Sequence, residues 1–332
     1  MEKRILGISE VSATAITFGA WAIGGWMWGG ADRKEALEAI RASLDNGITS
    51  IDTAPAYGQG LSEEIVGEAI QGTDRRQIQL LTKFGLSWDT AQGEYFFTSK
   101  NNDGLDIRIH KLASKAQIMK ECEDSLRRLR TDYIDLYQIH WPDGTTPISE
   151  TMEALQRLLV QGKIRAAGVC NYSAEQMATA EETLKLASNQ VPYSMVFRNI
   201  EKDVIPYALQ HHNAVIAYSP LQRGLLTGKI TPETPFNEGD TRQGNTFYRP
   251  ENIVAVNAFL DKLKPLARSK NATLGQLVIR WTLEQKGITI VLVGARNRQQ
   301  AIENARAQDV QLAPEELQYI SEELEKLELV RS

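Results

Sequence analysis

Four residues of different chemical types stand far apart in the chain: Asp52, Tyr57, Lys83 and His140. A free tyrosine is a poor acid at neutral pH because its pKa is about 10. A neighbouring ammonium stabilises the phenolate and lowers that pKa. Lys83 can supply the ammonium, and Asp52 can hold Lys83 in an ion pair. If His140 donates a hydrogen bond to a substrate oxygen, the set can protonate an alkoxide as it forms on a carbonyl carbon.

Further polar and aromatic residues suit a nicotinamide ring beside that acid. Asn171 and Gln190 carry amides that match a carboxamide, and Tyr218, followed by Ser219, offers a flat face for an aromatic ring. Taken singly, each of these residues has an ordinary structural explanation, such as capping a turn or ending a strand. Their chemistry therefore depends on whether the fold brings them together.

All these residues lie at the ends of predicted strands. Short β-branched runs alternate with amphipathic runs along the chain, which is typical of repeated βα units and a parallel sheet. We predict eight strands, at 15–21, 48–53, 78–83, 132–140, 164–171, around 190, 214–220 and 288–295. Helices with one apolar stripe fit between them, as in "DRKEALEAIRASLDNG". The pattern predicts an α/β fold, a (β/α)8 TIM barrel, whose C-terminal strand ends converge on one pocket.

Two polar insertions are longer than ordinary connections: 85–113 after the third strand and 231–250 after the seventh. Both follow the C-terminal end of a strand, so they are candidates for lids that shape a substrate pocket. Four tryptophans are candidates to line that pocket: Trp21, Trp26, Trp28 and Trp88. Near the end of the chain, "APEELQYISEELEKL" predicts an extra helix outside the barrel. No linker divides the chain, so residues 1–332 are expected to form a single domain.

The composition excludes several classes of function. The net charge is about −5 with both signs interspersed, so no basic face indicates nucleic-acid binding. The sequence shows neither a signal peptide nor an apolar run long enough to span a membrane. Cys122 and Cys170 lie far apart, which agrees with a reducing, cytoplasmic setting. No cluster of metal-ligating side chains appears. The expected partner is a small-molecule carbonyl or alcohol, and monomer and homo-oligomer both remain open.

Two glycine-containing stretches resemble phosphate-binding motifs without matching them. "GQGLSE", from Gly58, has Glu63 where a dinucleotide fingerprint needs its third glycine. "GLLTGKI", from Gly224, is one residue short of a P-loop and has Ile230 in place of the hydroxyl residue. The sequence therefore predicts neither a Rossmann nor a Walker site.

Other residues can still hold a dinucleotide. Lys229, the glycines around it and backbone amides near Gly294 can line a pyrophosphate. Arg296 and Arg298 stand where the last barrel helix should begin. Their guanidinium groups can bind a ribose 2′-phosphate bidentately, which would select NADP over NAD.

Motifs spread over nearly the whole chain resemble one family of enzymes. They are "FGAW", "DTAPAYG", "LLTKFG", "DYIDLYQIHWP", "GKIRAAGVCNYS", "AYSPLQRGLLTGK" and "VGARNRQQAIEN". In these motifs the sequence resembles the aldo-keto reductases, and it looks closest to their bacterial general-stress and glycerol-dehydrogenase-like branch. The resemblance implies a (β/α)8 enzyme that uses NADPH without a Rossmann fold and interconverts carbonyls and alcohols.

The resemblance also implies roles for individual residues. The family's catalytic tetrad falls on Asp52, Tyr57, Lys83 and His140, the same four residues. Its cofactor contacts fall on Gly19, Ala20, Trp21, Cys170, Asn171, Gln190, Tyr218, Ser219, Leu221, Arg223, Gly224, Lys229, Gly294, Arg296, Gln300 and Asn304. The family usually has serine where this chain has Cys170, and many members have a basic residue where it has Gln300. NADP(H) is the expected cofactor, with NAD(H) as the alternative.

One other class of function remains open. Some relatives with this fold are β-subunits of potassium channels, so a regulatory cofactor-binding module is the alternative to an enzyme. A metal-dependent barrel hydrolase is disfavoured because the ligands are missing. The substrate and the preferred direction of reaction are not predicted.

Overall fold

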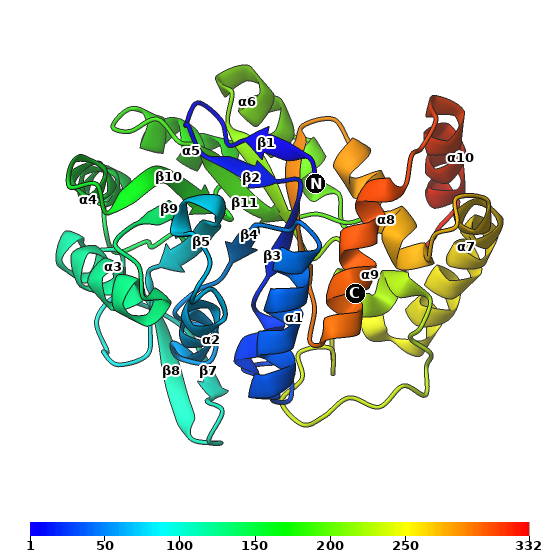
Figure 1. The fold of residues 1–332 in the computed structure, drawn as a ribbon, viewed down its shortest axis with the longest axis horizontal. Helices are drawn as coiled ribbons and strands as arrows, with labels where there is room; N and C mark the ends of the chain where they lie inside the picture. Colours follow the sequence, from blue (N-terminus) through cyan, green and yellow to red (C-terminus); the bar gives the residue numbers. More distant parts are fainter. Residues whose placement is uncertain (332) are drawn as a thin grey trace.

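The computed structural model describes residues 1–331 and contains a closed barrel of parallel strands (Figure 1). Around the barrel the strands follow the order β10 (Ile164–Cys170), β11 (Ser188–Pro192), β12 (Ala214–Tyr218), β13 (Ile288–Gly294), β3 (Ile16–Gly19), β4 (Ser50–Asp52), β5 (Gln79–Phe84) and β9 (Ile134–Ile139). Each matches one of the predicted strands, so the predicted (β/α)8 barrel is confirmed.

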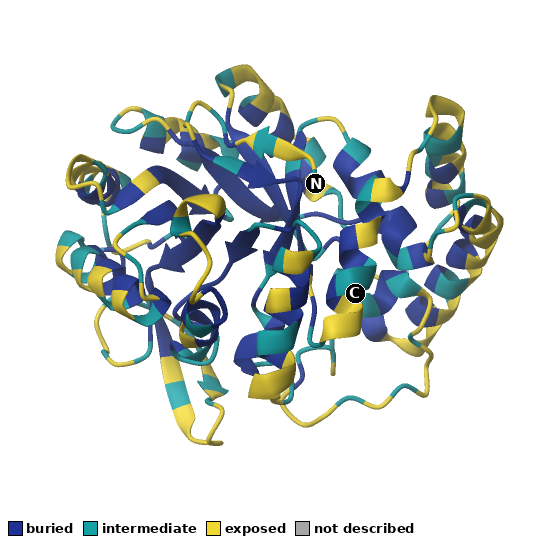
Figure 2. Ribbon diagram, viewed as in Figure 1, coloured by how far each residue is buried: buried dark blue, intermediate teal, exposed yellow. Residues whose placement is uncertain are grey.

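Helices cover the outside of the barrel and bury their inner faces against it (Figure 2). They are α1 (Arg33–Asp45), α2 (Leu61–Ala69), α3 (Lys115–Leu129), α4 (Ile148–Val160), α5 (Ala174–Glu181), α6 (Val204–His211), α7 (Pro250–Ser269), α8 (Leu274–Glu284) and α9 (Arg298–Ala305). The predicted extra helix is α10 (Pro314–Glu325), which packs against α7. Short 3-10 turns add η1 (Ala22–Gly24), η2 (Arg75–Gln77), η3 (Asn199–Glu201), η4 (Gln222–Thr227), η5 (Thr246–Tyr248) and η6 (Arg306–Asp309). Among residues 1–331, no helix is both long and apolar enough to cross a membrane.

Apolar side chains fill the barrel interior, so its axis is a packed core. The interior cluster includes Leu81, Leu136, Ile216 and Ile290, one from each of four strands. An N-terminal hairpin of β1 (Lys3–Ile5) and β2 (Ser12–Thr14) adds apolar side chains to the same cluster. Because this end is plugged, the opposite end, where the strands finish, is the one left to hold a site.

The two insertions both lie at that opposite end of the barrel (Figure 1). The first forms a small antiparallel sheet in the order β6-β8-β7, with β6 (Leu86–Ser87), β7 (Glu94–Lys100) and β8 (Asp106–Lys111). The second, residues 231–249, is mainly irregular apart from η5, and we refer to it as the strap. Their position agrees with the one predicted from the sequence.

Candidate active site

A pocket of about 620 Å³ lies at the C-terminal end of the barrel. Predicted residues from loops far apart in the chain meet in its wall: Gly19, Trp21, Asp52, Tyr57, His140, Asn171, Gln190, Tyr218, Ser219, Leu221, Arg223, Gly224, Lys229, Gly294, Arg296, Gln300 and Asn304. Three others, Ala20, Lys83 and Cys170, are buried and lie outside this lining. Arg298 is exposed and lies outside it as well.

The four residues predicted to carry the chemistry form one compact group. The Lys83 ammonium is fully buried, with its Nζ atom 2.6 Å from Oδ1 of Asp52. Lys83 also donates to the carbonyl oxygen of Thr53 at 2.9 Å, and its Nζ lies 5.0 Å from the centre of the Tyr57 ring. The rings of Tyr57 and His140 meet edge to face, with centroids 5.6 Å apart. Asp52, Tyr57 and His140 thus face the pocket, while Lys83 supports them from behind.

Close backbone contacts hold Tyr57 at the mouth of the barrel. The turn after β4 presses against η1, and a Cβ atom on Gly24 would lie 2.5 Å from the carbonyl oxygen of Tyr57. A Cβ atom on Gly58 would lie 2.3 Å from the carbonyl oxygen of Gly24, and Gly58 has a φ of 73°. Both positions therefore require glycine. The segment "DTAPAYG" carries the chain from the carboxylate at the end of β4 to the phenol above it.

Burial sets the protonation of this group more strongly than the sequence suggests. Burial raises the pKa of Tyr57 to about 12, although the charge of Lys83 opposes that rise. The predicted net lowering of the Tyr57 pKa is therefore wrong, because desolvation of a phenolate outweighs its attraction to Lys83. Burial, and then the charge of Lys83, holds the pKa of His140 well below its usual value. The imidazole is thus neutral at physiological pH.

Lys83 itself stays charged. Burial lowers the pKa of Lys83, but interactions led by the charge of Asp52 outweigh that effect, so the pKa ends above its usual value. Gln190 supports the other side of the ion pair by donating from Nε2 to Oδ2 of Asp52 at 2.8 Å. Each carboxylate oxygen of Asp52 therefore has a hydrogen-bond donor of its own.

Asn171 and Gln190, predicted to meet a carboxamide, lie side by side at adjacent strand ends. Asn171 has a φ of 60°, and its Nδ2 donates to the carbonyl oxygen of His140 at 3.0 Å. The Tyr218 hydroxyl donates to Oδ1 of Asn171 at 3.0 Å. A primary amide has two donor hydrogens and two acceptor lone pairs, so both residues keep hydrogen-bonding capacity for a ligand.

The turn after β12 has the geometry of an anion site. Ser219, Gln222, Arg223 and Gly224 all have positive φ, between 46° and 101°. Left-handed residues in a turn direct successive backbone N–H groups into a concavity that suits a phosphate. No atom lies within 4 Å of a Cβ placed on Gly224. Together with the amides and the Tyr218 ring, this turn fits the pyrophosphate and nicotinamide parts of a dinucleotide.

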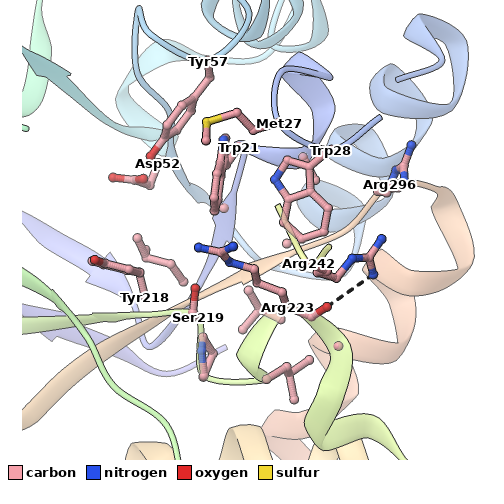
Figure 3. Close-up of a pocket in the computed structure, with 18 of the residues that line it drawn as sticks. Trp21, Met27, Trp28, Asp52, Tyr57, Tyr218, Ser219, Arg223, Arg242 and Arg296 are labelled. Carbon is pink, nitrogen blue, oxygen red and sulfur yellow. Dashed lines mark hydrogen bonds between the residues drawn. The ribbon is translucent and has the colours of Figure 1, made fainter. Parts of the chain in front are cut away.

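The strap contributes Arg242, a pocket residue that sequence reasoning missed. Arg242 pairs with the buried carboxylate of Asp240, and its guanidinium lies 5.2 Å from the Trp28 ring (Figure 3). Thr241 donates its backbone N–H to the carbonyl oxygen of Met27 at 3.1 Å. The strap has no apolar periodicity that could have placed it. Its basic residues, in an insertion expected at the barrel mouth, were the only signal.

Trp21 lies between the phenol and the basic side of the pocket (Figure 3). The Trp21 and Tyr57 rings have centroids 6.1 Å apart, and the Arg223 guanidinium lies 5.0 Å from the Trp21 ring. Arg296 reaches across from the loop after β13 and donates to the carbonyl oxygen of Gly30 at 2.7 Å. Three guanidinium groups, from Arg223, Arg242 and Arg296, therefore line this side, which suits a ligand that carries phosphates.

A second group of lining residues was also missed. It comprises Met27, Leu86, Phe96, Phe97 and Trp141. Trp141 directly follows His140, so its position at a strand end was the one available signal. The phenylalanines belong to β7, whose strand character the polar insertion did not reveal.

Comparisons with known proteins agree with this architecture. A model of the Aldo/keto reductase family matches residues 15–325. The aldo-keto reductase YhdN of Bacillus subtilis (strain 168) is 46% identical over 301 residues, which cover 89% of this chain and 85% of that protein. The NADH-specific methylglyoxal reductase of Escherichia coli (strain K12) is 35% identical over 333 residues, covering 99% and 100%.

Solved structures give the same result. The glycerol dehydrogenase AKR11B4 from Gluconobacter oxydans superposes with a TM-score of 0.86 at 40% identity, covering 98% of this chain and 95% of that one. An aldo-keto reductase from Klebsiella pneumoniae in complex with NADPH superposes with a TM-score of 0.71 at 30% identity, covering 97% and 96%.

Proposed function

This chain belongs to the aldo/keto reductase family and is an NAD(P)H-dependent oxidoreductase, and on that premise we propose that it interconverts small aldehydes or ketones and their alcohols with Tyr57 as the general acid and base. The buried arrangement of Tyr57 over the Lys83–Asp52 ion pair, beside His140, carries the proposal. Relatives named for methylglyoxal reduction and glycerol dehydrogenation support carbonyl and alcohol chemistry.

NADP(H) fits the residues of this pocket, and NAD(H) is the alternative cofactor. Asn171 and Gln190 would hold the carboxamide, and Tyr218 would stack on the ring. The turn at 219–224 would hold the pyrophosphate, and Arg296 the adenosine phosphate. When bound, the reduced nicotinamide supplies the hydride that reduces the carbonyl carbon.

The protein's own residues then supply the proton. Tyr57 is protonated at neutral pH, because its pKa is about 12. An alkoxide is a stronger base than a phenolate, so it can take the Tyr57 hydroxyl proton as it forms. The charged Lys83 stabilises the phenolate that remains, and Asp52 keeps Lys83 in place. The neutral imidazole of His140 orients the carbonyl oxygen by donating a hydrogen bond.

Turnover assays with a panel of small aldehydes test this function. We expect steady oxidation of NADPH, with the alcohol as product. Tight cofactor binding without turnover of any aldehyde would contradict the proposal and favour the regulatory alternative.

Arg296 is expected to contribute to cofactor choice. Arg296→Ala should raise KM for NADPH by about 10-fold or more, because a hydrogen bond to a charged group is worth about 1.5–3 kcal/mol. KM for NADH should change little. Arg298→Ala is the matched control, because Arg298 is exposed and lies outside the pocket lining. An equal loss for both cofactors would place Arg296 away from the 2′-phosphate.

Gln190 is expected to act on the pH dependence of the reaction as well as on cofactor binding. Burial raises the pKa of Asp52, and hydrogen bonds from Lys83 and Gln190 oppose that rise. Gln190→Met removes one donor, so the pKa of Asp52 should rise further. Asp52 would then be protonated, and lose its ion pair with Lys83, at a higher pH than before.

The acid limb of the pH profile of kcat, measured at saturating cofactor, should therefore move to higher pH in Gln190→Met. Gln190→Asn keeps an amide and serves as the comparison. A change confined to KM for the cofactor would mean that Gln190 does not support Asp52.

A further inference from the structure

The first turn of α2 follows directly on the turn that carries Tyr57. Gly60, which precedes the helix, has a φ of 101°, and the backbone N–H of Ser62 donates to the carbonyl oxygen of Tyr57 at 3.1 Å. Ser62 and Glu63 are both fully buried. Across the described chain, residues 1–331, neither of them lines the pocket. They therefore support the turn of Tyr57 from behind, without bordering the space for a ligand.

The Ser62 hydroxyl joins the ends of two barrel strands. Its Oγ donates to the carbonyl oxygen of Ala20 at 2.9 Å, just beyond β3, and lies 2.8 Å from Oγ1 of Thr53, just beyond β4. A hydroxyl has one hydrogen, so Thr53 is the donor in the second bond. The carbonyl oxygen of Thr53 in turn accepts a hydrogen bond from Nζ of Lys83 at 2.9 Å. One hydroxyl thus connects the first turn of α2 to the backbone group that binds Lys83.

Glu63 makes a parallel contact with β5. Its Oε1 accepts a hydrogen bond from the Thr82 hydroxyl at 2.6 Å, and its Oε2 accepts one from Nε of Arg128, on α3, at 2.6 Å. Successive side chains of a strand point to opposite faces. Leu81 belongs to the interior cluster, so Thr82 points outward to Glu63 and Lys83 points inward again. Glu63 is thus fixed by an ion pair at one oxygen and holds the strand of Lys83 with the other.

The side chains in these contacts form one unit, which we call the α2 anchor: Thr53, Ser62, Glu63 and Thr82. Its two threonines are the chain neighbours of Asp52 and Lys83. The α2 anchor therefore fixes the turn of Tyr57 relative to the Lys83–Asp52 ion pair. This placement matters because a misplacement of about 1 Å in a reacting group can cost about 10²-fold in rate.

We propose that Ser62 and Glu63 are positioning residues of the reaction: through the α2 anchor they hold the Tyr57 hydroxyl where it can give up its proton while Lys83 stabilises the phenolate. The inference rests on the proposed function, because it concerns the proton transfer of that reaction. It also gives a role to Glu63, whose carboxylate stands where the dinucleotide fingerprint resembled by "GQGLSE" would need glycine.

Ser62→Ala removes the hydroxyl that joins Ala20 and Thr53. The single-turnover rate of NADPH oxidation, at saturating aldehyde and cofactor, should fall by about tenfold, a partial loss of the positioning effect. NADPH affinity, measured by fluorescence, should stay within about twofold. Ser43→Ala is the matched control, because Ser43 is a buried helical serine that donates to the carbonyl oxygen of Ala39 within α1 at 3.0 Å. An equal loss of rate in the control, or a loss of cofactor affinity alone, would overturn the inference.

Thr82→Val and Thr82→Ser test the contact with Glu63. Valine has nearly the shape of threonine but cannot donate to Glu63, so the single-turnover rate should fall by about tenfold. Serine keeps the hydroxyl and should retain at least about half of the parent rate. Thr282→Val is the control, because the buried Thr282 hydroxyl donates to the carbonyl oxygen of Val278 within α8 at 2.8 Å. A serine variant as slow as the valine variant would overturn the role of Glu63.

Tyr57→Phe is the background that separates positioning from general damage. Without the phenol hydroxyl there is no proton donor to position, so Ser62→Ala should change the residual rate by less than about twofold. A tenfold loss in both backgrounds would show that Ser62 does not act through Tyr57, and would overturn the inference.

The two proposals fail in different ways. Absence of turnover with every aldehyde in the parent protein would remove the proposed function and the inference together. A parent that reduces aldehydes through Tyr57, with Ser62→Ala as fast as the parent, would remove the inference alone.

Discussion

Tyr57→Phe is expected to lower kcat for aldehyde reduction by about 10²–10⁴-fold, the usual contribution of a positioned general acid. The change removes the hydroxyl proton and keeps the ring, which packs against His140 and Trp21. Cofactor binding and stability should therefore stay close to those of the parent protein. The measurement is kcat with a saturating aldehyde, alongside NADPH affinity measured by fluorescence.

The pH profile of the parent enzyme provides a second check on the same assignment. With a pKa of about 12, Tyr57 keeps its proton throughout the neutral range. Burial and the charge of Lys83 keep the pKa of His140 well below its usual value, so the imidazole stays neutral there. Neither group should produce an ionisation limb between about pH 7 and 9. A Tyr57→Phe variant that kept a tenth or more of its activity would contradict the role of Tyr57.

The sequence predicted the grouping of the proposed catalytic residues because that grouping depends on strand ends. Strand periodicity located the ends of β4, β5 and β9, and a barrel necessarily brings such ends together. The meeting of Asp52, Tyr57, Lys83 and His140 followed from that rule alone. The structure adds what the rule cannot supply, such as the close contact of Gly24 with Tyr57 that fixes the phenol.

Other features of the pocket depend on burial and long-range contacts, which no local sequence pattern contains. The pKa of Tyr57 depends on how fully the phenol is buried, and composition does not reveal that burial. Phe96 and Phe97 share the pocket only because of a bulge, which breaks the alternation used to predict strand faces. Arg242 lies in the irregular strap, where long-range contacts with the loop after β3 set its position. Sequence reasoning therefore located the strand-end residues of the pocket better than those contributed by the two insertions.

Lys83→Met is expected to destabilise the protein by about 3–5 kcal/mol, the usual result of removing one partner of a buried ion pair. Lys83 is fully buried and Asp52 is 2% exposed, so the remaining carboxylate would have no opposite charge and little water. Gln190 would still donate to it. Chemical denaturation measures the loss, and Lys185→Met, at a lysine whose side chain is 62% exposed, is the matched control.

The loss of folding stability in Lys83→Met should depend on pH in a defined direction. Burial already raises the pKa of Asp52, and removing Lys83 removes an interaction that lowers it. Folding of Lys83→Met then favours the protonated acid, whereas the unfolded chain has an aspartate pKa of about 3.9. Below the unfolded-state pKa, protonation of Asp52 contributes its full stabilisation to the folded variant. That stabilisation is lost as the pH rises through the Asp52 pKa of the folded variant. Burial gives the parent the same kind of dependence up to its own Asp52 pKa, which also lies above the usual value. The destabilisation relative to the parent should therefore grow as the pH rises above the Asp52 pKa of the folded parent.

Adding Asp52→Asn to Lys83→Met separates the structural role of the ion pair from its proposed catalytic role. The double variant buries no unpaired charge, so most of the lost stability should return, and its pH dependence should disappear. Activity should not return, because no ammonium remains to stabilise the Tyr57 phenolate. A double variant as unstable as Lys83→Met would show that packing, rather than the buried carboxylate, causes the loss. Recovered turnover would show that Tyr57 works without Lys83, contrary to the proposed mechanism.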